Sequence, residues 1–199
     1  YGLLTHPTIP PLSACLAIGD MLGGIDGETF LTAFVAGFEV ECKVAEAINP
    51  DHYNLGFHTS GTIGTFASAV ASAKLLGLDE AGIARTIGGA ASMAAGIRAN
   101  FGTMGKPMLV ARSSENGVTA ALLVSEGFTF NEEALDGKWG YIEVPGRGGE
   151  DAHALVQDLV GRLFDVTARE PWLPALWLRE IVNEGGLLRE RVLARVPVG

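Results

Sequence analysis

Two histidines stand where an irregular segment meets a predicted helix, and imidazole is the side chain best suited to proton transfer near neutral pH. His6 directly precedes a proline, and His58 directly precedes a threonine that is expected to cap a helix. Both are candidates for acid–base chemistry, and a structural role is the alternative for each. Two further residues of the same kind, His52 and Tyr53, are expected to pack within a loop, and His153 is expected to be solvent-exposed.

A run of positive charge without acidic residues crosses the middle of an acidic chain. No Asp or Glu occurs from residue 81 to 114, although the 199 residues carry a formal net charge of −9. Guanidinium groups bind carboxylates in a bidentate manner and lysine adds a point charge, so this run suits a di- or tricarboxylate. Basic side chains scattered over the surface are the alternative. The four cations are Arg85, Arg98, Lys106 and Arg112.

Lys106 stands out among these cations because glycine precedes it and proline follows it. Both neighbours restrict or define the backbone of a loop. The sequence therefore predicts an ammonium group that an ordered loop directs toward a site, and not one that trails from a helix surface.

Several classes of site lack their usual sequence pattern. There is no HxH or HExxH spacing, P-loop or GxGxxG motif, so neither a metal nor a nucleotide cofactor is expected. Cys15 and Cys42 are isolated, which is typical of buried free thiols in a reducing cytoplasm. A pI near 4.9 disfavours nucleic acid as a partner. The charge-free stretch 54–73 is too polar for a membrane helix and is expected to be buried in protein.

Helix caps and apolar periodicity predict a series of helices that position these groups. Phe30, Phe34 and Phe38 recur at four-residue steps and predict a core-facing stripe, and glycines and alanines predict close helix contacts. Residues 139–144 read as a short strand. The expected helices cover residues 11–22, Asp26 to Ile48 with a stop at Asn49-Pro50, 59–76, a segment from Asp79 onward, 113–126 and 151–163.

Three stretches together resemble the MmgE/PrpD family, which includes 2-methylcitrate dehydratase and cis-aconitate decarboxylase. The resemblance runs in order over about residues 5 to 140 and is specific. The stretches are HPTIPPLSA, HYNLGFHTSGTIGTFASAVASAKLLGL and GIRANFGTMGKPM with the following SSENGV and ALLVSEGFT.

The resemblance implies an all-α fold, a large helical bundle over residues 1–146, and a homodimer without metal or cofactor. The family's smaller α/β lid domain is expected to be missing or rudimentary here, since residues 147–199 read as a diverged or truncated segment. The start at Tyr1 and the absence of a recognisable upstream motif lead us to expect a piece of a longer protein.

By motif, the resemblance implies that His6, His58 and Lys106 are catalytic. Arg98 and Arg112 are expected to bind the substrate carboxylates. The expected activity is that of a metal-independent, cytoplasmic lyase that eliminates water from a 2-hydroxy di- or tricarboxylate. The alternatives are a decarboxylase or epimerase of the same family, or a catalytically silent helical dimerisation module. Leu109 departs from the family, which commonly has a histidine at this point.

Overall fold

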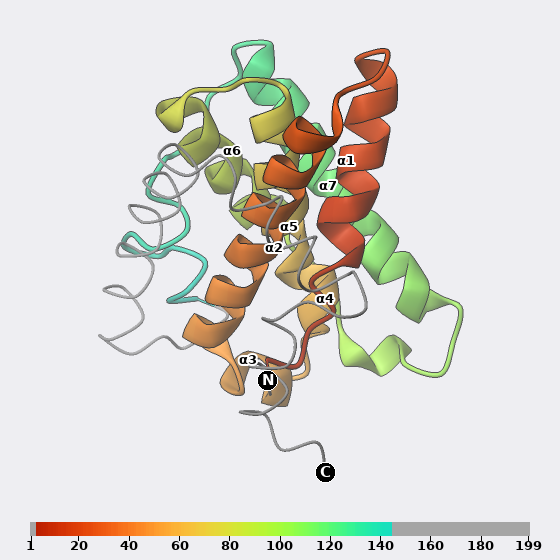
Figure 1. Cartoon of the computed structure of the whole chain (residues 1–199). Helices are drawn as coiled ribbons and strands as arrows, with labels where there is room; N and C mark the ends of the chain where they lie inside the picture. The colour runs from red at the N-terminus through yellow and green to blue at the C-terminus, as the bar shows by residue number, and fades with distance from the viewer. Residues whose placement is uncertain (1–2, 145–199) are drawn as a thin grey trace, which may run out of the picture.

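The computed structural model describes residues 3–144, which are almost entirely helices and their connections (Figure 1). No β-strand occurs within these residues, so the expected all-α class is confirmed for them. The expected helix at 151–163, His153 and the segment 147–199 lie outside the described residues. In chain order the elements are α1 (Ile9–Met21), α2 (Gly27–Ile48), α3 (Asp51–Asn54), α4 (Thr59–Thr62), α5 (Gly64–Leu75), α6 (Glu80–Met93), the 3₁₀ turn η1 (Arg98–Asn100) and α7 (Gly105–Ser125).

Local capping sets several of the helix boundaries. The Asp26 carboxylate accepts a hydrogen bond from Thr29 N–H at 2.9 Å, and Asp79 accepts one from Gly82 N–H at 2.8 Å. Gly77 follows α5 with φ +70°, a left-handed conformation that glycine adopts without strain. The predicted start of α2 at Asp26, its stop at Asn49, and the start of α6 at Asp79 are confirmed.

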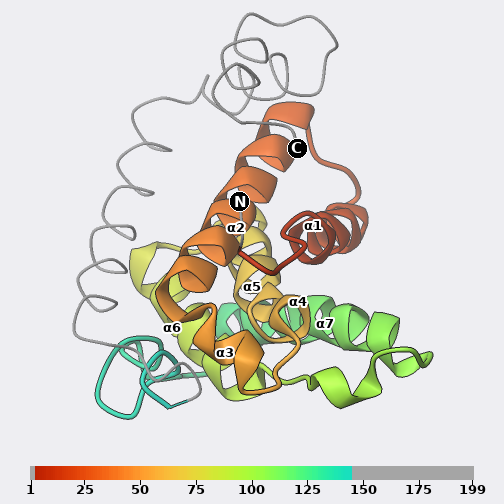
Figure 2. The same cartoon turned by 90° about the horizontal axis from the view of Figure 1, so that it is seen from below.

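α5 is the central helix of the bundle, and all of its residues except Lys74 are buried. It packs against α1, α2, α6 and α7, which surround it in Figures 1 and 2. The segment 54–73 is thus buried by protein where it forms α4 and α5, as expected. No helix within the described residues is long and apolar enough to cross a membrane.

Small residues allow the helices to approach closely. A Cβ added at Gly37 of α2 would lie 2.4 Å from the Ala67 carbonyl oxygen of α5. One added at Gly117 of α7 would lie 2.0 Å from Ser68 Oγ, also on α5. The expectation of close contacts is confirmed, and Ser68 Oγ also donates a 2.7 Å hydrogen bond to the Ser113 carbonyl of α7.

Two local predictions are wrong, and a third is confirmed only in part. The helix expected at 59–76 is interrupted at Ile63, which separates α4 from α5. Residues 139–144 form turns, because Tyr141 and Ile142 bond back to Ala134 and Leu135 and make no ladder with a partner strand. The phenylalanines of α2 are only half-buried: Phe30 and Phe34 pack against a core cluster, but the fully buried face of the helix is offset from them. The close approach of α5 favours small side chains there, and the buried face contains Ala33, Ala36, Gly37, Val40, Glu41, Val44, Ala45 and Ile48.

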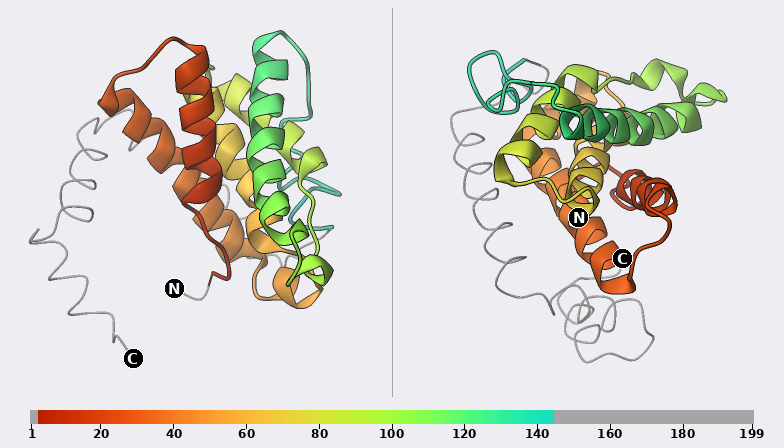
Figure 3. Two further views of the ribbon diagram at one scale, coloured as in Figure 1. Left: turned by 90° about the vertical axis from the view of Figure 1, so that its right-hand side faces the viewer. Right: turned by 90° about the horizontal axis from the view of Figure 1, so that it is seen from above.

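One end of the bundle collects the elements that carry the candidate site. α1, α5 and α7 all begin there, and the N-terminal segment reaches the same end (Figures 1 and 3). α4 lies at this end close to the start of α7, with which it is in contact. Contacts with Ser60 and Phe101 bring His6, His58 and Lys106, which follow one another at intervals of about 50 positions, into this region of the fold.

Candidate active site

His58 occupies the N-cap position of α4 in an extended conformation, with φ −90° and ψ 96°. Its side chain is only 4% exposed. Its backbone N–H donates to the Gly96 carbonyl at 3.1 Å, and the Arg98 N–H donates to the Gly56 carbonyl at 2.8 Å. This short antiparallel bridge ties the 56–58 segment to the segment that precedes α7, so the position of His58 is set from two directions.

The ring of His58 has few polar neighbours. Its edge meets the Phe101 ring at right angles with 5.0 Å between centroids. A Cβ on Gly61 would lie 3.1 Å from His58 Nδ1, so the absence of a side chain at that position makes room for the ring. Nδ1 itself is buried and has no hydrogen-bond partner among the described residues.

Lys106 lies in the first turn of α7, and the prediction that it belongs to a loop is wrong. α7 begins at Gly105, eight residues before the expected start, because Pro107 fits the first turn of a helix as well as it fits a loop. The Lys106 Nζ lies 4.9 Å from the centroid of Phe101, the same ring that contacts His58. The side chain is exposed, and within residues 3–144 it forms no ion pair.

His6 approaches α4 from the N-terminal segment. Its backbone N–H donates to Ser60 Oγ at 2.9 Å, while the residue itself is exposed. Burial lowers the pKa of His58, and the nearby basic side chains of Lys106 and His6 lower that pKa further. Both basic side chains thus lie within electrostatic range of one imidazole. His58 is held toward its neutral form, which can accept a proton.

The other basic residues of the 81–114 run have different surroundings. Arg85 pairs with Glu132 at 3.1 Å, and Arg112 pairs with Glu115 at 2.6 Å on an exposed face of α7. The guanidinium of Arg98 stacks 3.8 Å from the centroid of Tyr53 and donates to the Tyr53 carbonyl at 2.9 Å. No described contact brings Arg98 or Arg112 onto the His58 ring. Their predicted roles in substrate binding stay predictions.

Sequence reasoning missed a buried acid next to this group. Glu41 of α2 is 0% exposed, and the Thr5 hydroxyl donates a short hydrogen bond to its Oε1. The only signal in the sequence was its register: Glu41 falls on the same helical face as Val40, Val44 and Ala45, where an apolar residue is the rule. Burial raises the pKa of Glu41 to about 7, and the hydrogen bond from Thr5 opposes that rise.

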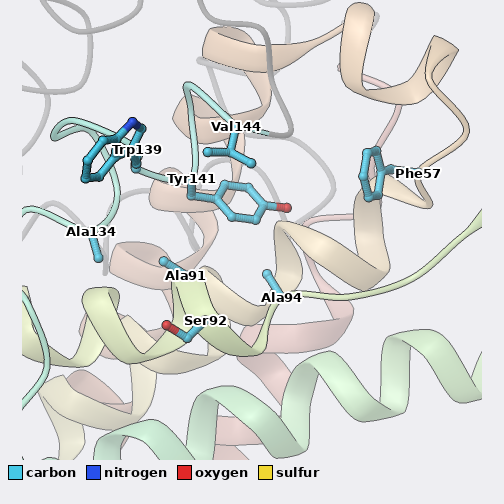
Figure 4. A pocket seen from close by; sticks show the side chains of 9 residues that line it. Phe57, Ala91, Ser92, Ala94, Ala134, Trp139, Tyr141 and Val144 are labelled. Carbon is cyan, nitrogen blue, oxygen red and sulfur yellow. The ribbon is translucent and has the colours of Figure 1, made fainter.

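A separate hollow lies between the end of α6 and the segment 134–144 (Figure 4). It has a volume of about 310 Å³ and contains none of His6, His58 and Lys106. His52 is fully buried and stacks on Phe57, a lining residue, with 4.4 Å between ring centroids; its Nε2 bonds Thr62 Oγ1 at 2.8 Å. The predicted packing role of His52 is confirmed. The hollow is lined by Phe57, Ala91, Ser92, Ala94, Ala134, Trp139, Gly140, Tyr141 and Val144.

Metal ligands do not cluster in the part of the chain that the structure describes. No group of three or more His, Cys, Asp or Glu side chains there is arranged to hold an ion. Cys15 is buried, Cys42 is half-buried, and both are free thiols. Burial raises the pKa of each thiol to about 12, so both are protonated and poor nucleophiles near neutral pH.

An all-α bundle with two histidines and a lysine at one end defines a helical domain with a candidate acid–base site. A family model described as the MmgE/PrpD N-terminal domain matches residues 3–153. The chain therefore belongs to the MmgE/PrpD family, as the sequence motifs indicated.

Curated relatives of the chain are named as cis-aconitate decarboxylases. The human protein of that name is 30% identical over 141 residues, which cover 69% of this chain and 29% of the human protein. A cis-aconitate decarboxylase-like protein, oryM, of Aspergillus oryzae is 33% identical over 118 residues, covering 58% of this chain and 24% of that protein. The Aspergillus terreus cis-aconitate decarboxylase is 31% identical over 124 residues. The chain thus matches only about a quarter of the length of these relatives.

Proposed function

We propose that this chain provides the helical part of a metal-independent lyase that decarboxylates cis-aconitate or a closely similar tricarboxylate. The observation that carries the proposal is the arrangement of His6, His58 and Lys106 around α4 and Phe101. Family membership supports a lyase, and the names of the relatives favour decarboxylation over the dehydration of 2-methylcitrate that the sequence motifs first suggested.

Decarboxylation requires a site that accepts negative charge and then supplies a proton. When the bond between carbon and the departing carboxylate breaks, carbon dioxide leaves and the electron pair stays on carbon, delocalised toward a neighbouring unsaturated carboxylate. Lys106 is suited to stabilise that charge, because it has no carboxylate partner among the described residues. One proton is then transferred to carbon from His58 or His6, which leaves a dicarboxylate product.

The charge distribution at this end of the bundle supports the binding of an anion. α1, α5 and α7 each direct a helix N-terminus, which carries partial positive charge, toward the end where Lys106 lies (Figure 3). Lys106 adds to that potential. A bound polyanion would in turn favour protonation of His58, so substrate binding and proton supply are coupled.

The test is an assay of the full 199-residue chain with cis-aconitate and, separately, with 2-methylcitrate, each with a metal chelator present. We expect release of carbon dioxide and a dicarboxylate from cis-aconitate, and loss of at least about 100-fold in kcat/KM for Lys106→Ala and His58→Gln. The exposed Lys138 stacks on Trp139, away from this group, so Lys138→Ala is the matched control and should retain wild-type activity.

Other outcomes separate the remaining functions. Turnover of 2-methylcitrate alone would replace decarboxylation with dehydration at the same site. A folded chain that neither turns over nor binds either carboxylate would contradict the proposal. That outcome, together with self-association in sedimentation equilibrium, would favour a helical dimerisation module.

A further inference from the structure

Glu41 differs from every other carboxylate in residues 3–144, because it alone is buried, and it has no basic partner there. Transfer of an ionised carboxylate from water into a protein interior is unfavourable unless charge or hydrogen bonds compensate. A methyl-bearing side chain at this position on the apolar face of α2 would avoid that cost. The carboxyl therefore needs an explanation other than stability.

A line of hydrogen bonds joins Glu41 to the candidate catalytic segment. Thr5 Oγ1 donates to Glu41 Oε1 and lies 3.3 Å from Ser60 Oγ. Ser60, which is 2% exposed, accepts the backbone N–H of His6 at 2.9 Å. The line thus runs from α2 through the N-terminal segment to α4, and it ends on the peptide group of His6.

The single proton of each hydroxyl determines which group donates and which accepts in these hydrogen bonds. The Thr5 hydroxyl has one proton, and when it donates that proton to Glu41 it can only accept from Ser60. The Ser60 hydroxyl then donates to Thr5, and its remaining lone pairs face the His6 N–H. By accepting from Thr5, Glu41 Oε1 therefore orients both hydroxyls so that Ser60 is an acceptor for His6.

We propose that Glu41 is a positioning residue that holds His6 against α4 through Thr5 and Ser60. This inference rests on the proposed function, in which His6 acts on the substrate. Glu41 does not contact His6 itself, and its effect is transmitted by the two hydroxyl groups. The orphaned second oxygen, Glu41 Oε2, has no partner among the described residues, which leaves the Thr5 bond as the main polar anchor of this side chain.

The experiment measures hydrogen exchange of individual backbone amides in the full chain by NMR, because a positioning role and a purely structural role differ in that readout. Loss of a local anchor accelerates exchange of the His6 amide alone, whereas general destabilisation also accelerates amides of the central helix such as Ala69. Glu41→Leu removes the hydrogen bond between Thr5 and Glu41, and Thr5→Val removes that bond and the contact with Ser60. Thr5→Val keeps the shape of the side chain and serves if Glu41→Leu fails to fold.

We expect both variants to accelerate exchange of the His6 amide at least about tenfold while Ala69 changes by less than about twofold. Glu41→Gln retains an acceptor oxygen for Thr5 and should keep most of the protection. Glu46→Gln is the matched control, because Glu46 lies on the same helix but is exposed and paired with Lys43. Unchanged exchange at His6 in Thr5→Val, or acceleration of His6 and Ala69 in equal proportion, would overturn the proposal.

Binding of cis-aconitate by the wild-type chain, measured by calorimetry, separates this inference from the function on which it rests. If the wild type binds and the two variants bind at least about tenfold more weakly, both proposals are supported. If the His6 amide responds as expected but the wild type binds no carboxylate, the hydrogen-bonded anchor stands and the proposed function fails.

Discussion

His58 shows how narrowly one side chain can be enclosed by its neighbours. Phe101 contacts the ring edge, and Gly61 leaves the space that Nδ1 needs. Gly61→Ala places a methyl group 3.1 Å from Nδ1 and 3.2 Å from Leu109 Cβ, a separation that forces a shift of a few tenths of an ångström. We expect a small loss of stability, about 1 kcal/mol, and a larger loss of activity, about tenfold or more in kcat.

The measurement combines steady-state kinetics with the NMR signals of the His58 ring. Displaced ring signals together with reduced kcat would support the role of Gly61 in orienting His58. Wild-type kcat and unshifted ring signals in a folded Gly61→Ala protein would contradict it.

The buried carboxyl of Glu41 is expected to make the free energy of unfolding depend on pH. Its pKa is raised from 4.5 to about 7 in the folded chain, so the folded state binds a proton more tightly than the unfolded state does. Stability from this group is therefore present at low pH and is lost as pH rises from about 4.5 to about 7, by roughly 3 kcal/mol at most. We expect Glu41→Gln to remove this loss and to be at least as stable as wild type near about pH 8.

Urea unfolding at a series of pH values tests this expectation. The lowered pKa of His58 has the opposite sign, since it contributes stability that is lost as pH falls below about 6.5. That contribution is common to both proteins and cancels in their difference. Parallel pH profiles for wild type and Glu41→Gln would show that Glu41 does not titrate in this range.

At the scale of the elements, the close contact between α5 and α7 positions the first turn of α7, which contains Lys106, near α4. A Cβ on Gly117 would lie 2.4 Å from the Ala69 backbone nitrogen and 2.7 Å from the Thr65 carbonyl oxygen, so the two helices would have to separate. We expect Gly117→Ala to cost about 3 kcal/mol in the free energy of unfolding. Gly27→Ala is the control, because Gly27 begins α2 with no neighbouring atom within 4 Å and should be neutral or slightly stabilising.

Chemical denaturation of the two glycine variants provides the comparison. If Gly117→Ala were as stable as Gly27→Ala, the close approach of α5 and α7 would be wrong. The position of Lys106 relative to α4 would then need revision as well.

At the scale of the whole molecule, a net charge of −9 opposes the binding of a polyanion except where positive charge gathers. We expect cis-aconitate to bind with proton uptake, because the anion favours the protonated form of His58, whose pKa is lowered by burial in the unliganded chain. Affinity should therefore fall as pH rises through the range in which His58 loses its proton, and it should weaken with added salt. Calorimetry in buffers of different ionisation enthalpy measures the uptake directly, and binding without a proton change would contradict a role for the imidazoles.

Some features follow from short stretches of sequence. The aspartates at 26 and 79 cap α2 and α6 as their positions predicted, since a cap depends on atoms only three residues away. The all-α class and the family membership likewise follow from periodicity and from local motifs that contain His6, His58 and Lys106.

Tertiary structure decided which basic side chains pair with carboxylates and which polar groups are joined by hydrogen bonds. Arg85 is neutralised by Glu132, 47 positions away, and Glu41 is linked to Thr5, 36 positions away. Electrostatic and hydrogen-bond energies depend on distance through space, and no periodicity along the chain reports that distance. Of the four cations in the basic run, Arg85 and Arg112 pair with carboxylates, Arg98 is held by the ring and carbonyl of Tyr53, and Lys106 stays within electrostatic range of His58.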